Sequence, residues 1–219
     1  MKRAICFMLA AFLLMTGALS ETVAFAPLRF SFWGDPAQGY EWSCGYQENG
    51  VLSAPVENYV EAPGAMGGDF EFQFEILSPG RAHIAFNYGP SDALSVPSQT
   101  ALCTVVARED GTSDLFWARR YGDDHSVEIT LPAGAADLQW RYISEENDMA
   151  RLVSQEFEEG ADGSAGSARF LFSIEQPGAT VLRFEYLNPW DPDTAAQQSY
   201  ALDLTVNTEM EISMAVLDE

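Results

Sequence analysis

The chain has 219 residues, with 33 acidic against 11 basic side chains and a formal net charge of −22. Such a charge repels nucleic acid and anionic membrane surfaces, so nucleic-acid binding and peripheral lipid binding are excluded as expected functions. The length allows one large domain or two small ones.

Residues 1–20 have the pattern of a secretory signal peptide. Lys2 and Arg3 form a basic start, residues 5–15 are almost wholly apolar, and small residues follow as far as Ser20. The apolar run is shorter than the ~20 residues that a membrane-spanning helix needs, so we expect no membrane span. We therefore expect cleavage near Ser20 and a secreted or extracytoplasmic mature chain.

Beyond this segment, the sequence repeats itself at a fixed offset. The matched pairs, 98 positions apart, are Trp42 with Trp140, Phe72 with Phe170, Phe74 with Phe172, Pro79-Gly80 with Pro177-Gly178, and Tyr88 with Tyr186. A change of two residues in the next loop then aligns Leu102 with Leu202. The pattern predicts two tandem copies of one unit.

The repeated unit reads as β-structure. Residues 70–76 and 170–174 alternate apolar with polar side chains, as do residues 82–88 and 180–186. Successive strand side chains point to opposite faces, so each segment buries one face and exposes the other. The Pro-Gly pairs between them predict turns that join the two strands of each copy into a hairpin. Short strands separated by turns predict an all-β fold of two tandem immunoglobulin-like β-sandwich domains.

The domain boundaries follow from the repeat. We expect a first sandwich over residues 27–107, a linker over 108–122 and a second sandwich over 123–219. The linker contains Leu115-Phe116-Trp117, which is too apolar for a free tether. We therefore expect this segment to pack between the two copies.

Residues that carry catalysis or bind metal are sparse. His83 and His125 are the only histidines, and neither has a neighbouring Cys, Asp or Glu at the spacing of metal ligands. The segment Asp162–Gly166 lacks the first glycine of a nucleophile elbow. We therefore expect no enzymatic activity, no metal and no cofactor.

Two cysteines, Cys44 and Cys103, remain after removal of the leader. An exported protein can form a disulfide between them. Two free thiols in the interior explain the same pair equally well, and the sequence leaves both alternatives open.

The connecting segments carry the functional signal. Three segments combine turn residues with exposed contact residues: Asp35, Pro36, Ala37, Gln38, Gly39 and Tyr40; then Gly64, Met66, Gly67 and Gly68; then Asn188, Pro189 and Trp190. In order and in flanking strands, they resemble the loops of chagasin-type inhibitors of papain-like cysteine proteases. That family's pattern is Asn-Pro-Thr-Thr-Gly-Tyr, a Gly-x-Gly-Gly loop, and Arg-Pro-Trp. The resemblance extends over both copies, residues 27–210.

The resemblance implies a function. Family members fill a protease cleft with three loops at one end of the sandwich and are not cleaved. We expect this chain to be a monomer. The expected partner is therefore a papain-like cysteine protease. In this chain, the first two loops match in the first copy and the third in the second copy. An alternative is an extracellular binding or structural module that keeps the fold but has lost the inhibitory loops.

Overall fold

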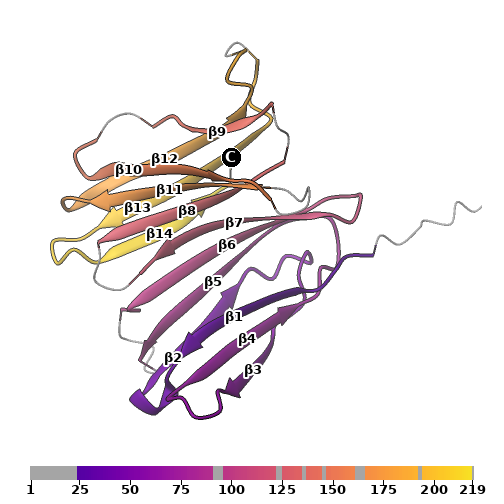
Figure 1. The fold of residues 1–219 in the computed structure, drawn as a ribbon, viewed down its shortest axis with the longest axis vertical. Coiled ribbons are helices and arrows are strands. Elements are labelled where there is room, and N and C mark those ends of the chain that lie inside the picture. The colour runs from indigo at the N-terminus through magenta and orange to yellow at the C-terminus, as the bar shows by residue number, and fades with distance from the viewer. Residues whose placement is uncertain are drawn as a thin grey trace, which may run out of the picture.

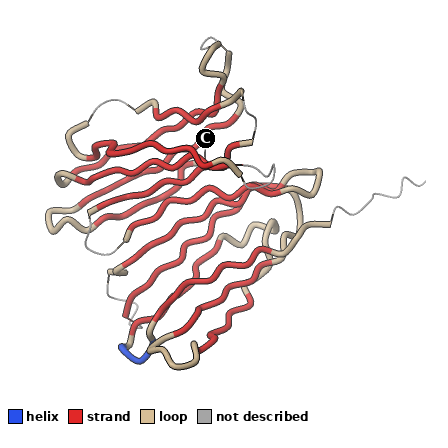
Figure 2. The backbone as a smooth tube through the Cα atoms, in the orientation of Figure 1, coloured by secondary structure: helices blue, strands red, loops and turns tan. Residues whose placement is uncertain are grey.

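The structure is a computed structural model that describes residues 24–90, 96–121, 125–134, 137–144, 147–160, 166–191 and 194–218. The predicted signal peptide lies outside the described residues. The described chain is β-structure apart from loops and one short 3₁₀ helix, η1 (Pro36–Gln38), as Figure 2 shows. The expectation of an all-β sandwich fold is confirmed.

The described residues form seven strands in each half of the chain. The first half forms β1 (Leu28–Gly34), β2 (Tyr40–Tyr46), β3 (Val56–Glu61), β4 (Gly68–Phe74), β5 (Gly80–Pro90), β6 (Gln99–Ala107) and β7 (Ser113–Arg120). The second half forms β8 (Ser126–Ala133), β9 (Gln139–Tyr142), β10 (Ala150–Glu158), β11 (Gly166–Ile174), β12 (Gly178–Leu187), β13 (Gln198–Val206) and β14 (Ile212–Leu217).

The strands form three antiparallel sheets (Figure 1). The first sheet has the order β1-β4-β3, and the third has the order β14-β13-β12-β9. The central sheet, β10-β11-β8-β7-β6-β5-β2, combines four strands of the first half with three of the second. Its two parts meet where β7 pairs with β8. The halves therefore share one continuous sheet.

Two hydrophobic cores result. The first sheet packs against the β2-β5-β6-β7 part of the central sheet, around rings such as Phe72 and Phe86. The third sheet packs against the β8-β11-β10 part, around Phe170 and Phe184. All four of these side chains have at most 2% of their surface exposed. Burial of large aromatic side chains is the main stabilising contribution in both halves.

Strand β7 contributes to both cores. Leu115 and Trp117 pack against the first core, whereas Phe116 and Ala118 belong to the second. Alternate residues of a strand point to opposite faces, so the two cores lie on opposite faces of the central sheet. Residues 108–122, predicted as a linker, thus contain a strand with both faces packed.

The predicted hairpins are wrong. β4 and β5 flank Pro79, but β4 lies in the first sheet and β5 in the central sheet. The reason is that both strands have an apolar face to bury. Phe72 of β4 and Phe86 of β5 face each other across the core, with ring centroids 5.2 Å apart. The Pro-Gly turn therefore carries the chain from one sheet to the sheet that faces it.

The register corrects one part of the repeat alignment. Cys103 lies opposite Ile84, and Leu202 lies opposite Leu182, which is 98 positions after Ile84. Leu202 therefore corresponds to Cys103 and not to Leu102. The loop before β13 is one residue longer than the loop before β6, rather than two.

Strand direction places the loops at two ends of the molecule. Segments that follow β1, β3 and β5 emerge at one end, which we call the first pole, and β7 also runs toward this end. Because β8 pairs with β7 in antiparallel fashion, it runs away from the first pole. The segments that follow β8, β10 and β12 therefore emerge at the opposite end, the second pole.

Candidate binding loops

The first predicted loop folds as a compact turn at the first pole. The carboxylate of Asp35 accepts hydrogen bonds from the Ala37 backbone N–H, at 3.1 Å, and from the Gln38 side-chain amide, at 2.8 Å. Gly39 closes the turn with φ +76° and donates its N–H to the Pro36 carbonyl oxygen at 2.9 Å. The carboxylate therefore holds the loop in shape with both of its oxygen atoms.

Small residues shape the second predicted loop. Ala62 donates its N–H to the carbonyl oxygen of Gly67 at 3.1 Å, which closes the loop, and Gly64 has a φ of +76° within it. A Cβ added to Gly67, whose φ is +119°, would lie 2.6 Å from the carbonyl oxygen of Gly34. The glycine therefore allows the first and second loops to meet, and it leaves Met66 79% exposed.

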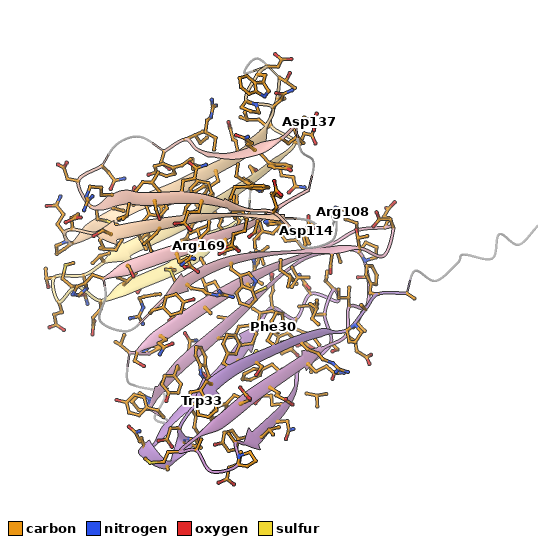
Figure 3. All side chains as sticks on the ribbon, viewed as in Figure 1. Phe30, Trp33, Arg108, Asp114, Asp137 and Arg169 are labelled. Carbon is orange, nitrogen blue, oxygen red and sulfur yellow. The ribbon has the colours of Figure 1, made fainter. Side chains whose placement is uncertain are left out.

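An exposed tryptophan that we did not predict as a site residue lies between these loops. Trp33, at the end of β1, is 53% exposed, and its ring would contact a Cβ on Gly67 at 3.1 Å. Figure 3 labels it near the lower end of the molecule. The sequence contained the signal, because alternation that buries Phe30 places Trp33 on the other face.

The third predicted loop lies at the second pole. Trp190 has 87% of its surface exposed, the largest exposed fraction among the large apolar side chains of the described residues. The side-chain oxygen of Asn188 accepts the backbone N–H of Trp190 at 2.9 Å, and its carbonyl oxygen accepts the N–H of Asp191 at 3.2 Å. The turn thus presents the indole to solvent on a backbone held by two hydrogen bonds.

A packed tryptophan–tyrosine pair supports each pole. At the first pole, the ring centroids of Trp42 and Tyr88 are 5.3 Å apart, and the Tyr88 hydroxyl accepts the backbone N–H of Asp35 at 3.4 Å. At the second pole, Trp140 and Tyr186 are 5.1 Å apart, and the Tyr186 hydroxyl accepts from Gly134 at 2.9 Å. Each pair therefore links the first loop of its pole to the strand that precedes the third loop, which is β5 at the first pole and β12 at the second.

A pocket of about 530 Å³ opens at the second pole between the segments that follow β8 and β10. Leu138 and Trp140 line it, and Phe157, 60% exposed, stands at its edge. Glu156 and Glu159 add negative charge to the lining. The pocket therefore suits an apolar side chain, with acidic groups beside it for a cationic end. Of the segment Asp162–Gly166, residues 162–165 lie outside the described residues.

The structure brings together some of the predicted site residues and separates others. Residues 35–40 and 64–68 lie side by side at the first pole, where Gly67 approaches Gly34. Residues 188–190 follow β12 at the second pole, at the other end of the molecule (Figure 1). The three loops therefore do not form one contact surface, although the sequence reproduces the family's order of loops.

The candidate disulfide between Cys44 and Cys103 is not formed, and both thiols are free. Cys44 lies on β2 and Cys103 on β6, with β5 between them. Neighbouring strands are about 4.8 Å apart, so the two Cα atoms are separated by roughly 9 Å or more, beyond the ~7 Å limit for a bridge. Burial, and then the nearby charge of Glu57, raises the pKa of the Cys44 thiol to about 12.

Other chemistry is sparse in the described part of the chain. It holds no group of three or more His, Cys, Asp or Glu side chains arranged to bind a metal ion. His83 instead lies between the hydroxyl of Thr104 and the carboxylate of Asp218, each 2.9 Å from a ring nitrogen. It joins β5 of the first half to the end of β14. Among the described helices, none has the length and hydrophobicity to cross a bilayer.

Comparison with known protein families identifies the second half. Residues 123–204 match the family described as Chagasin family peptidase inhibitor I42. Over these residues the second half of the chain is similar to the chagasin family. The match covers β8 to β12 and most of β13, and it includes all three segments of the second pole. Comparison with curated proteins and with solved structures gives no match.

This match bears on the three loops described above. The description of the matched family is that of peptidase inhibitors. The match contains Asn188, Pro189 and Trp190, but it does not extend to the first-pole residues 35–40 and 64–68.

Proposed function

We propose that this protein is an exported inhibitor of papain-like cysteine proteases, and that the loops of its second pole block the active-site cleft. The observation that carries the proposal is the display of Trp190. Its indole is 87% exposed at the tip of a turn, inside the part of the chain that matches the chagasin family. The basic and apolar residues of the leader support export.

The geometry of this loop suits a contact residue. A largely exposed tryptophan buries a large apolar surface when it enters a groove, and tryptophan is among the most frequent energetic anchors of interfaces. Asn188 already holds the turn in one conformation through the backbone N–H groups of Trp190 and Asp191. Little conformational entropy is therefore lost on binding, which increases affinity.

We also infer that the two halves are copies of one unit. Their strands share one order, since β2-β5-β6-β7 corresponds to β9-β12-β13-β14 and β1-β4-β3 to β8-β11-β10. The indole N–H of Trp42 donates to the Trp33 carbonyl oxygen, and that of Trp140 donates to the Pro132 carbonyl oxygen. Superposition of the halves in a crystal structure tests this; a different strand order in the two halves would contradict it.

Titration of papain and cathepsin L with the full chain tests the proposed function. Replacement of Trp190 by Ala should weaken protease binding at the second pole by about 2–4 kcal/mol, or ~30- to 1,000-fold in the inhibition constant of that pole. Val153→Ala is the matched control, since Val153 is 50% exposed on β10 of the same half, away from the β12–β13 turn. Absence of inhibition by the unchanged chain at micromolar concentration would refute the function.

One observation favours a second candidate function. The three predicted loops are divided between two poles, so the chain lacks the single three-loop surface that the resemblance implied. A binding or structural module outside the cytoplasm would keep the sandwich without needing that surface. Normal inhibition with a dependence on Trp190 contradicts this candidate, whereas recovery of a non-protease partner together with absent inhibition supports it.

A further inference from the structure

The pairing of β7 with β8 has a consequence for the number of partners. Arg120, at the end of β7, lies opposite Val127 near the start of β8, and β8 then runs the other way. Any loop set at the second pole therefore faces away from the first pole. Figure 3 shows the two directions, with Trp33 labelled at the lower end and Asp137 at the upper end.

The first pole is itself a surface with the properties of a contact site. Three large apolar side chains are exposed there: Trp33 at 53%, Tyr40 at 37% and Met66 at 79%. Isolated exposed apolar residues are common, but three of them on two adjoining loops and the strand ends beside them are characteristic of a binding surface. The first pole therefore presents an aromatic and sulfur-containing patch comparable in kind to the surface around Trp190.

Trp33 gives the first pole an exposed tryptophan, which the third loop of the first copy does not provide. The predicted third loop of the first copy has no tryptophan, because Tyr88 is followed by Gly89-Pro90-Ser91. The indole of Trp33 instead lies over Gly67, so an exposed tryptophan sits beside the second loop. Both poles thus expose one indole, on β1 at the first pole and on the β12–β13 turn at the second.

Both loops of the first pole are held in shape before any partner arrives. Asp35 accepts two hydrogen bonds within its own loop, and Ala62 closes the other loop onto Gly67. The Tyr88 hydroxyl accepts the Asp35 N–H, as the Tyr186 hydroxyl accepts the Gly134 N–H. Such preorganisation reduces the entropy lost on association at the first pole as it does at the second.

We propose that one chain binds two molecules of the papain-like protease at once, one at each pole. This inference rests on the proposed function, because it takes the occupant of the first pole to be the same class of protease. Strands of eight residues such as β7 and β8 are roughly 26 Å long, and the poles lie beyond their opposite ends. Two globular partners that approach from opposite directions do not overlap.

Stoichiometry provides the test. The full-length chain is mixed with excess active papain, and the mass of the complex is measured by size-exclusion chromatography with multi-angle light scattering. We expect two protease molecules per chain, and isothermal titration should reach equivalence at two proteases per inhibitor. A complex with one protease, together with full inhibition, overturns the inference and leaves the proposed function intact. No complex and no inhibition refute the proposed function itself.

Pole-specific variants assign the two sites. Trp190→Ala should leave one protease, bound at the first pole, and the double variant Trp33→Ala/Met66→Ala should leave one bound at the second. Val153→Ala should retain two. If the Trp33→Ala/Met66→Ala chain still binds two proteases with unchanged affinity, the first pole is not a binding site. Circular dichroism on each variant shows whether the fold is kept, and the result with the unchanged chain decides the stoichiometry without any variant.

Discussion

The strands β1 and β8 occupy corresponding places in the two halves but have different neighbours. β1 pairs with β4, and β8 pairs in the same register with β11. β1 is the edge of its sheet, whereas β8 also pairs with β7 in the interior of the central sheet. The comparison shows how one added neighbour changes what a strand position can contain.

The effect is clearest at Arg29 and Glu128, which hold the same register position. Arg29 lies opposite Gln73 and is exposed, while Glu128 lies opposite Leu171 and is only 8% exposed. Glu128 accepts a hydrogen bond from Arg169 at 2.7 Å and lies 3.8 Å from Arg119 of β7. A charged side chain at the sheet edge is solvated by water, whereas a buried carboxylate beside β7 must be paired with cationic side chains.

The largest predicted effects test whether the shared sheet makes the halves one folding unit. Phe86 and Phe184 are at most 1% exposed, one in each core, so replacing either by Ala should cost about 3–5 kcal/mol. Because β7 packs into both cores, we expect one cooperative urea transition for each variant, by circular dichroism and tryptophan fluorescence alike. Two separated transitions, with only one shifted by each variant, would show that the halves unfold independently.

The cysteines sharpen this test because both lie in the first half. Cys103 is 1% exposed, and the raised pKa of Cys44 leaves little thiolate near pH 8, so alkylation of the native protein should be slow. If unfolding is shared, Phe184→Ala should accelerate alkylation of Cys103 by roughly 100-fold or more, as Phe86→Ala does. Acceleration by Phe86→Ala alone would contradict shared unfolding.

A smaller effect is expected at the junction of the two halves. Glu128→Gln keeps the shape but removes the charge that Arg169 and Arg119 face, and should cost about 1–3 kcal/mol. Arg29→Gln, the control at the corresponding edge position, should change stability by less than about 0.5 kcal/mol. Chemical denaturation measures both. Equal effects would mean that burial beside β7 does not distinguish the two positions.

Much of the fold could be predicted because a strand with one buried face and one solvent-exposed face keeps a clear alternation of apolar and polar residues. The segments around Phe72, Phe86 and Phe170 alternate clearly, and each forms a strand with those rings inside. The run Leu115-Phe116-Trp117 shows no alternation because both faces of β7 are packed, so the sequence alone predicts a linker there. A period-two pattern shows which face is buried but not which strand lies alongside, and the predicted hairpins failed for that reason.

The candidate site divides in the same way. Exposure of Trp190 could be predicted from its place beside Pro189 in a turn, and the turn exists as expected. The separation of Trp190 from Gly39 and Met66 could not, because it depends on the antiparallel pairing of β7 with β8. The order of loops along a sequence does not show at which end of the molecule each loop lies. That also requires the pairing of the strands.

The smallest predicted effect concerns how each core is filled beside β7. At one register position, the first half has Ala101 and the second has Tyr200, whose ring lies 5.7 Å from that of Phe116 of β7. At another, the first half has Trp117 and the second has Val216. The large ring therefore comes from β7 in the first core and from β13 in the second, so each core pairs one large with one small side chain.

Tyr200 fills its core with a ring that carries a buried hydroxyl, whereas Trp117 does not. Its hydroxyl is buried without a hydrogen-bond partner among the described residues, and burial raises the pKa of the phenol. Tyr200→Phe removes an unsatisfied polar group and keeps the ring. The free energy of unfolding should therefore stay unchanged or rise by up to about 1 kcal/mol. The midpoint of urea unfolding measures this. A loss of more than about 1 kcal/mol would mean that the hydroxyl is bonded in solution, and the two cores would then differ in polarity as well as in ring placement.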